Sequence, residues 1–444
     1  MRRAPRCVCP AGEGGIFSCP RRRIGGGPLQ RRISGVNAYV GGRFIPSDII
    51  IEGGKIVSVA PAKSPLSRES HLYCVPGFTD VHVHLREPGF SYKETIATGS
   101  LAGARGGYTS LCAMPNLNPA PDSVAHLREQ LEIIDRDAVI DVRPYGTITK
   151  NEAGAALSDM EALAEYVVAF SDDGHGVQSD GMMRAAMTKA KALGKLIAAH
   201  CEDNRLLRGG CVHDGAYARA HDLPGICSES EWGQIARDIQ LARETGCGYH
   251  VCHISTKESV ALIRQAKSEG LDVSCETAPH YLLLTDADLK DEGRFKMNPP
   301  VRDAADRAAL LEGITDGTID MIATDHAPHA AKEKAKGLRG SAMGIVGLET
   351  AFPLLYTHLV KEQRLITLEK LVDLMSVAPA RRFGLESGIA PDADANLALW
   401  DLDAEYKIDP ADFLSMGKAT PFEGWKVNGR CVETLYKGET VYTT

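Results

Sequence analysis

The feature that most constrains the fold of this chain is a repeating order of short apolar segments and helical patterns through its middle. Eight segments have the Val, Ile, Leu and Ala content of buried strands: residues 78–85, 108–114, 139–146, 166–172, 196–201, 249–255, 271–277 and 319–326. Helical patterns follow them, as at 122–137 and 229–246. Eight such units predict an α/β protein with a (β/α)8 TIM barrel. A doubly wound open sheet is the alternative, but no GxGxxG motif follows a strand segment.

The two ends of the chain have a different pattern. Residues 35–76 alternate apolar and polar side chains between Gly-Gly and Pro turns, and a similar texture returns over 389–444. This predicts one small β-sandwich domain built from both ends, beside a barrel over 77–388. Residues 1–34 are rich in Arg, Gly and Pro and have no periodicity. We expect them to be a disordered or non-native extension.

Composition excludes several classes of partner. The chain has 50 basic and 58 acidic residues, a formal charge of −8, whereas nucleic-acid binding normally needs an excess of basic residues. No run approaches the ~18 apolar residues that span a bilayer, so we expect no membrane partner. The 12 cysteines form no CxxC pair, which is typical of buried thiols in a reducing compartment. We therefore expect a cytoplasmic location.

Imidazoles and carboxylates stand where the apolar segments end. The first segment carries His82 and His84, the fourth and eighth lead to Asp173 and Asp325, and the fifth and sixth end near His200 and His253. One such residue is more often a core histidine or a helix cap. In a barrel, however, the carboxyl ends of all strands meet at one rim, so six together favour a metal site. This donor set suits Zn²⁺, with Co²⁺ or Mn²⁺ as substitutes, and its spacing leaves open whether one or two ions bind.

The sequence around these residues resembles the bacterial class I dihydroorotases of the amidohydrolase superfamily. The resemblance covers roughly residues 36–443, and its first motif is PGFTDVHVHLREPG at 76–89. Further matching stretches lie at 104–123, 169–178, 198–204, 249–259, 296–302, 322–329 and 344–358. Members of this family are expected to act on a small cyclic amide. A homodimer and a complex with aspartate transcarbamoylase are the macromolecular partners that the resemblance suggests.

The resemblance also implies roles for individual residues. It assigns the first zinc to His82, His84 and Asp325, the second to His200 and His253, and a bridging position to Asp173 and a hydroxide. Related cyclic amidases use a carboxylated lysine as this bridge, and we expect none here. The expected substrate contacts are His84, Arg86, Asn116, Asn298, His329, Met343 and Gly344. Arg86 is expected to bind the substrate carboxylate through two charge-assisted hydrogen bonds.

The reaction that the resemblance implies is the reversible hydrolysis of (S)-dihydroorotate to N-carbamoyl-L-aspartate, the third step of de novo pyrimidine (UMP) biosynthesis. Metal-bound hydroxide is expected to attack the ring carbonyl, with Asp325 as general base and then general acid. The alternatives are another cyclic amidase (dihydropyrimidinase or allantoinase) and a non-catalytic partner of aspartate transcarbamoylase. A zinc-stabilised structural protein is disfavoured, because closed structural sites usually use cysteine.

Overall fold

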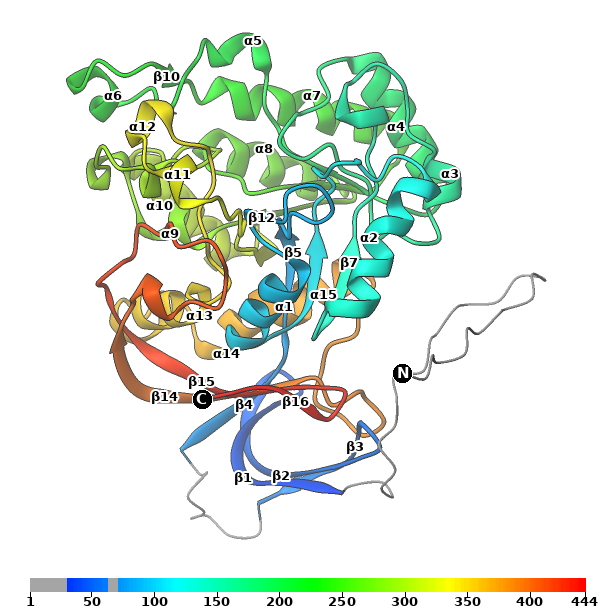
Figure 1. Ribbon diagram of the computed structural model, residues 1–444, viewed down its shortest axis with the longest axis vertical. Coiled ribbons are helices and arrows are strands. Elements are labelled where there is room, and N and C mark those ends of the chain that lie inside the picture. The colour runs from blue at the N-terminus through cyan, green and yellow to red at the C-terminus, as the bar shows by residue number, and fades with distance from the viewer. Residues whose placement is uncertain (1–29, 63–70) are drawn as a thin grey trace, which may run out of the picture.

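The computed structural model describes residues 30–62 and 71–444, and it divides into a β-sheet domain and a larger mixed α/β part (Figure 1). The predicted α/β class and a separate β-sheet domain are both confirmed. Most of the predicted N-terminal extension lies outside the described residues. Its last residues do not, because the first strand begins at Arg31 and pairs with the second from that residue onward.

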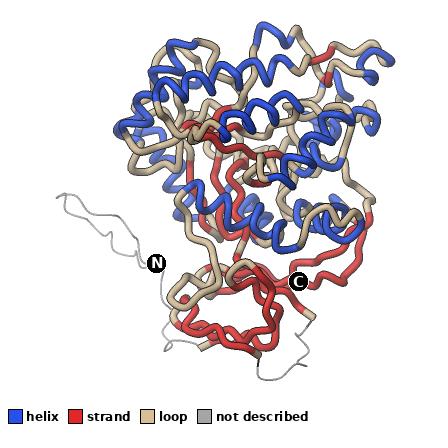
Figure 2. The backbone as a smooth tube through the Cα atoms, turned by 180° about the vertical axis from the view of Figure 1, so that it is seen from behind, coloured by secondary structure: helices blue, strands red, loops and turns tan. Residues whose placement is uncertain are grey.

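The β-sheet domain is one seven-stranded sheet, which lies below the α/β part in Figure 2. It takes strands from both ends of the chain, blue and red in Figure 1. Its order is β16-β15-β14-β4-β1-β2-β3. The strands are β1 (Arg31–Val40), β2 (Arg43–Glu52), β3 (Lys55–Pro61), β4 (Leu72–Pro76), β14 (Leu397–Lys407), β15 (Lys426–Tyr436) and β16 (Glu439–Thr443). The pairing of β4 with β14 joins the two chain ends, and the sheet encloses its own apolar cluster around Ile49, Ile56 and Leu397.

The α/β part contains two parallel sheets, of three and four strands. Their orders are β5-β6-β7 and β13-β12-β11-β8. The strands are β5 (Phe78–Val83), β6 (Tyr108–Ala113), β7 (Asp141–Pro144), β8 (Ile197–Ala199), β11 (Tyr249–Val251), β12 (Val273–Thr277) and β13 (Met321–Ile322). Seven of the eight predicted strand segments therefore contain a strand. A two-stranded pair, β9 (Val212–His213) and β10 (Gly225–Ile226), lies in the insertion that follows β8.

The predicted strand at 166–172 is wrong. Within it only Phe170 makes ladder contacts, as isolated parallel bridges to Gly146 on one side and to Ile197 on the other. The segment is apolar enough to be buried, but one bridge on each side does not make a strand. Parallel pairing continues across this gap, so Phe170 links the three-stranded sheet to the four-stranded one.

Helices pack around these sheets. The longer ones are α1 (Ile96–Arg105), α2 (Val124–Asp137), α4 (Asp180–Ala192), α7 (Glu229–Thr245), α8 (Lys257–Ser268) and α10 (Ala304–Asp316). The shorter ones are α3 (Met160–Leu163), α5 (Asn204–Leu207), α6 (Ala216–Ala220), α9 (Pro279–Leu283), α11 (Ala331–Lys334), α12 (Gly337–Gly340), α13 (Ala351–Leu355), α14 (Leu368–Val372) and α15 (Ala378–Phe383). Two π-helical turns, Tyr356–Glu362 and Asp373–Val377, continue α13 and α14.

Local sequence explains where the main helices begin and end. The side chains of Thr95, Ser123 and Thr256 accept hydrogen bonds from the first turns of α1, α2 and α8, which satisfies otherwise unpaired N–H groups. Gly246 ends α7 with φ 66°, a left-handed conformation that glycine adopts without a steric penalty. The helices expected at 122–137 and 229–246 are thus confirmed within one or two residues.

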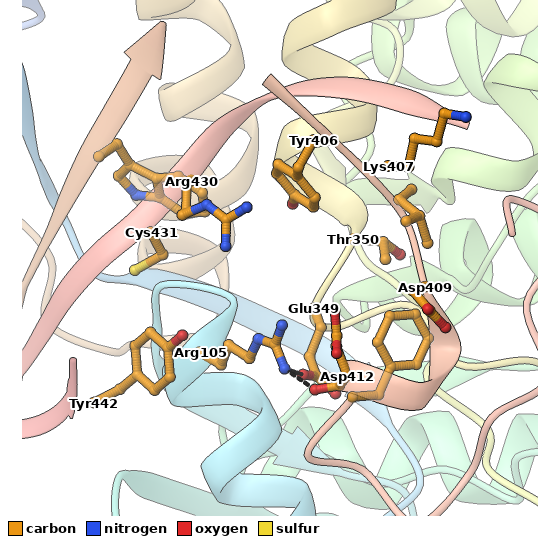
Figure 3. Close-up of a pocket in the computed structure, with 13 residues that line it drawn as sticks. Arg105, Glu349, Thr350, Tyr406, Lys407, Asp409, Asp412, Arg430, Cys431 and Tyr442 are labelled. Carbon is orange, nitrogen blue, oxygen red and sulfur yellow. Dashed lines mark hydrogen bonds and ion pairs between the residues drawn. The ribbon is translucent and has the colours of Figure 1, made fainter. Parts of the chain in front are cut away.

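The sheet domain meets the α/β part through buried aromatic rings. Trp400 of β14 packs on Phe352 of α13 at 4.2 Å and on Phe78 of β5 at 5.8 Å between ring centroids. Next to these rings lies a small pocket of about 150 Å³ in which Arg105 of α1 forms an ion pair with Glu349 at 3.2 Å (Figure 3). None of its lining residues is a predicted site residue. Within the described residues, no helix has the length and apolar content to cross a membrane.

Replacing Trp400 with alanine tests this junction. The side chain is 1% exposed, so its loss leaves a cavity and is expected to reduce the free energy of unfolding by about 3–5 kcal/mol. Val57→Ala, at a 45% exposed position, is the control and should stay within about 0.5 kcal/mol. Chemical denaturation followed by circular dichroism gives both values. Equal effects of the two substitutions would contradict the packing role of Trp400.

Candidate metal centre and substrate cavity

The six predicted metal ligands lie together at the carboxyl ends of the parallel strands. They are His82 in β5, His84 after β5, Asp173 after the Phe170 bridge, His200 after β8, His253 after β11 and Asp325 after β13. All six side chains are buried. Residues up to 243 positions apart in sequence, such as His82 and Asp325, are thus neighbours in space.

Asp173 is at the centre of this cluster. Its Oδ1 lies 3.2 Å from His82 Nε2, and its Oδ2 lies 3.4 Å from His84 Nε2. On its other side, Oδ1 is 3.8 Å from His200 Nδ1 and 3.6 Å from His253 Nε2. Two groups of possible ligands therefore share this one carboxylate: His82, His84 and Asp173, and Asp173, His200 and His253.

The donor atoms have the arrangement of a metal site rather than of a hydrogen-bonded network. Asp173 Oδ1 and His82 Nε2 are buried and have no hydrogen-bond partner among the described residues. His200 Nδ1 and His253 Nε2 lie 3.0 Å apart, close enough for both nitrogens to bind one cation. Nitrogen and carboxylate donors of this kind suit zinc. The residues present therefore fit a divalent metal ion.

Asp325 completes the cluster beside the first group. Its Oδ1 lies 3.1 Å from His84 Nε2 and 3.6 Å from His82 Nε2. Burial opposes ionisation, but the contact with His84 and the nearby imidazoles hold the pKa of Asp325 well below its usual range. Asp325 is therefore a carboxylate at neutral pH and is able to accept a proton.

Three residues of the site have left-handed backbone conformations that are rare outside glycine. They are Arg86 with φ 64°, His253 with φ 35° and Asp325 with φ 47°. Each turns the chain sharply just after a strand, which directs its side chain into the cavity. Such conformations cost about 1–3 kcal/mol each and persist where surrounding contacts hold them.

Sequence reasoning missed Glu276, which orients His82. Glu276 is buried at the end of β12, and its Oε1 accepts from His82 Nδ1 at 2.8 Å while Oε2 accepts from His250 Nε2 at 3.1 Å. Burial opposes its ionisation, but the hydrogen bonds from the two histidines lower the pKa of Glu276 to about 2. Holding the hydrogen on Nδ1 leaves Nε2 of His82 free to bind a metal. Its position at the end of the seventh apolar segment was the available signal.

The two predicted asparagines contact predicted metal ligands. Asn116 Oδ1 lies 3.0 Å from His84 Nδ1, and Asn116 Nδ2 lies 3.5 Å from Asp173. Asn298 Nδ2 donates to Glu202 Oε1 at 2.8 Å and lies 3.4 Å from His200 Nε2. Glu202 is a second carboxylate that sequence reasoning did not single out, although it lies in the matching stretch 198–204.

Arg86 and His329 lie side by side on the cavity wall. Arg86 Nε donates to the Pro328 carbonyl at 3.2 Å, and burial lowers the pKa of Arg86 to about 10, so it stays charged at neutral pH. His329 Nε2 donates to the Met343 carbonyl at 2.7 Å, and His329 Nδ1 accepts from Lys93 at 3.3 Å. Burial and the charges of Arg86 and Lys93 lower the pKa of His329 to about 3. His329 is therefore neutral at neutral pH, and Arg86 is a cation that lines the cavity.

Met343 and Gly344 form the neighbouring part of the wall. Gly344 has φ 130°, and a Cβ there would lie 2.7 Å from the Ala327 carbonyl oxygen, so only glycine fits. The buried Lys334 ammonium donates to the carbonyls of Ala342 and Lys296, at 2.7 and 2.9 Å. These bonds hold the segment that leads to Met343 against the cavity.

A single cavity of about 480 Å³ joins these groups. Its polar lining includes His84, Arg86, Asn116, Asp173, His200, Glu202, His253, Asn298, Asp325 and His329. The outer wall comes from the insertion after β8, through Leu207, Gly209, Gly210 and Ile226. These four residues carry no chemical signal in the sequence and were not predicted. The volume suits one small molecule beside the carboxylates and imidazoles.

Comparison with known proteins identifies the family. Residues 72–259 match the family model described as dihydro-orotase-like. A dihydroorotase of Bacillus cytotoxicus is 49% identical over 408 residues, which are 90% of this chain and 95% of that protein. A dihydroorotase of Bacillus cereus strain B4264 is 48% identical with the same coverage. The chain belongs to the dihydroorotase family. The resemblance inferred from the sequence motifs is thus confirmed.

Solved structures of other cyclic amidases share the fold of this dihydroorotase family member. The L-hydantoinase (dihydropyrimidinase) of Arthrobacter aurescens superposes with a TM-score of 0.82 at 27% identity, covering 93% of this chain and 96% of that one. A dihydropyrimidinase of Brevibacillus agri NCHU1002 gives a TM-score of 0.80 at 22% identity, covering 94% and 95%. The shared fold includes the α/β part and the sheet domain, since the coverage spans both.

Replacing Glu276 with glutamine tests its role at His82. Because the amide can donate as well as accept, it no longer enforces a hydrogen on Nδ1, and zinc affinity should fall about 10–100-fold. Glu312→Gln is the control, because that α10 side chain is 66% exposed and removes the same charge. Competition with a chromophoric chelator measures both affinities. An unchanged affinity in Glu276→Gln would refute the assigned role.

Proposed function

We propose that this protein is a dihydroorotase, which interconverts dihydroorotate and N-carbamoyl-L-aspartate. The observation that carries the proposal is that Arg86, a buried cation, lines the same cavity as the cluster of imidazoles and carboxylates. A substrate with a ring amide and a carboxylate matches this pairing, since one end needs hydrolytic chemistry and the other a cation. The relatives named dihydroorotase, at 48–49% identity, support the same assignment.

The proposal extends to the architecture, as a (β/α)8 barrel over 77–388 with a β-sandwich over 35–76 and 389–444, in which the one seven-stranded sheet would fold over its own apolar cluster. Parallel contacts support a closed ring. They run through β5, β6 and β7, cross by Phe170 to β8, β11, β12 and β13, and return by the bridge between Val83 and His326. One hydrophobic cluster takes residues from almost every step of this ring: Val81, Cys112, Tyr145, Ala169, Ala198, Cys252 and Met321.

The metal content that we propose is two zinc ions. His82, His84 and Asp325 would hold one, His200 and His253 the other, and Asp173 would contact both, as its position between the two ligand groups supports. When bound, such ions supply a Lewis acid for the carbonyl and lower the pKa of water. We also propose a cytoplasmic location, supported by nine described cysteines that are all free thiols.

The side chains of the cavity have different roles in the proposed reaction. Arg86 holds the substrate carboxylate and so places the ring against the histidine cluster. Asp325, ionised and within 4 Å of two imidazoles, takes the proton from the attacking water. It then returns that proton to the departing ring nitrogen, which balances the hydrolysis. In the direction of ring closure the same carboxylate first removes the proton from the carbamoyl nitrogen.

Turnover of three ring substrates tests the function itself. The zinc-loaded protein should hydrolyse dihydroorotate, whereas dihydrouracil and hydantoin, which have no carboxylate for Arg86, should react at least about 100-fold less efficiently by kcat/KM. Spectrophotometric assays on all three substrates, with the zinc content measured in parallel, decide between this proposal and a dihydropyrimidinase. Preferred hydrolysis of dihydrouracil would overturn it.

Replacing Asp325 with asparagine should remove the proton carrier. We expect kcat to fall by about 10²–10⁴ while most of the zinc is retained, because five further ligands remain. The measurement pairs steady-state rates with elemental analysis of zinc. Rates close to the wild type in a variant with full zinc would exclude Asp325 as the general base.

Replacing Arg86 with methionine should weaken recognition of the carboxylate. KM for dihydroorotate is expected to rise roughly 10–100-fold, with a smaller change for dihydrouracil, which has no carboxylate to lose. Arg219→Met on α6, where the side chain is 69% exposed, removes the same charge away from the cavity and serves as the control. An equal effect of Arg86→Met on both substrates would contradict this role.

A further inference from the structure

We propose that Glu202 is a positioning residue that fixes the side-chain amide of Asn298 so that its oxygen faces the substrate as an acceptor for a ring N–H. This inference rests on the proposed function, because it specifies how the same cavity recognises the ring of a cyclic amide. Glu202 is 8% exposed and lines the cavity between His200 and Asn298. Its two oxygens contact two different side chains, so one carboxylate couples a metal ligand to a substrate contact.

Which ring nitrogen of His200 carries the hydrogen depends on which one faces the metal cluster. His200 Nδ1 faces His253 and Asp173 at 3.0 and 3.8 Å, in the metal cluster. A metal at Nδ1 requires the hydrogen on Nε2, and Nε2 lies 3.6 Å from Glu202 Oε2. One oxygen of Glu202 therefore faces the N–H side of His200 at 3.6 Å, which favours the ionised, acceptor form of this carboxylate.

The orientation of the Asn298 amide follows from this. A carboxylate accepts hydrogen bonds and donates none, so the amide atom 2.8 Å from Glu202 Oε1 has to be the NH₂ group. This group also lies 3.4 Å from His200 Nε2, a longer contact between two donors that the charge-assisted hydrogen bond to Glu202 outweighs. The amide oxygen is then the end left for the cavity, which Asn298 lines. Without Glu202 the Asn298 amide could rotate so that its oxygen and its NH₂ group exchange places, because these two groups have nearly the same shape.

Asn116, across the cavity, has the opposite polarity. His84 Nε2 points to Asp173 and Asp325, so its hydrogen is on Nδ1, and that hydrogen goes to Asn116 Oδ1 at 3.0 Å. The NH₂ group of Asn116 makes only long contacts, 3.5 Å to the Asp173 carbonyl and Oδ2, and is presented to a ligand in the cavity, whereas Asn298 presents its oxygen. A ligand that satisfies both offers an acceptor oxygen to one asparagine and an unsubstituted N–H to the other. This matches a cyclic amide and excludes the same ring with a methylated nitrogen.

The test uses Glu202→Gln, whose amide can donate to Asn298 and so permits the reversed orientation. With zinc in excess, affinities for dihydroorotate and its ring N-methyl analogues are measured by calorimetry, together with KM, kcat and zinc content. One analogue carries its methyl group on the ring nitrogen that faces Asn298. In the wild type this analogue should bind at least about tenfold more weakly than dihydroorotate. In Glu202→Gln that ratio should shrink toward one and KM should rise about tenfold, while Glu202→Asp restores part of the ratio.

Two further variants make the outcome decisive. Asp203→Asn is the matched control, because it removes the neighbouring charge, which pairs with Arg205, and should keep the wild-type ratio. In Asn298→Ala the preference for dihydroorotate over the methyl analogue should disappear, and adding Glu202→Gln to this variant should cause no further change. Asn298→Ala also serves as the test if Glu202→Gln does not fold or does not retain zinc. A wild-type ratio in Glu202→Gln or Asn298→Ala would overturn the inference. Failure of the wild type to hydrolyse dihydroorotate would refute only the proposed function, because the N–H against N-methyl comparison applies to any cyclic amide that binds.

Discussion

The whole site depends on one electrostatic constraint, the burial of the Asp173 carboxylate among four imidazoles. Their nitrogens lie 3.2–3.8 Å from its oxygens, and none of these five side chains is exposed to solvent. Burying a charge and unpaired lone pairs in this way is costly unless a partner compensates. Divalent cations between the donors would provide that compensation and would explain why buried atoms such as His82 Nε2 lack hydrogen-bond partners in the described part of the chain.

Polar residues around the cluster face three of its four imidazoles. Glu276 and Asn116 hydrogen-bond to His82 and His84, and Glu202 lies 3.6 Å from His200, in each case at the ring nitrogen that points away from the cluster. Two of these three residues also line the substrate cavity. In the proposed site, metal binding and substrate recognition would therefore be coupled through shared side chains, and the polarity of the asparagines would follow from the tautomers that the metal cluster requires.

The sequence predicted the inner part of this arrangement better than the outer part. Residues such as His200 and His253 stand where apolar segments end, and parallel strands bring those ends to one rim, so their meeting follows from the fold class. Glu276 and Glu202 were missed because one carboxylate near a strand end is indistinguishable from a helix cap until its partners are seen. The strand expected at 166–172 is a single bridge at Phe170, since apolar content indicates burial and not pairing. The wall at Leu207–Gly210 depends on tertiary packing of an insertion.

The most direct test of the central claim is anomalous X-ray diffraction at the zinc absorption edge from crystals of the zinc-loaded protein. The account predicts two peaks, one on either side of the Asp173 carboxylate and about 3.5–4 Å apart. Each should lie about 2.0–2.2 Å from the imidazole and carboxylate atoms that face it. Absence of zinc from this cluster, or zinc only at the separate group of His213, Asp303 and Asp306, would contradict it.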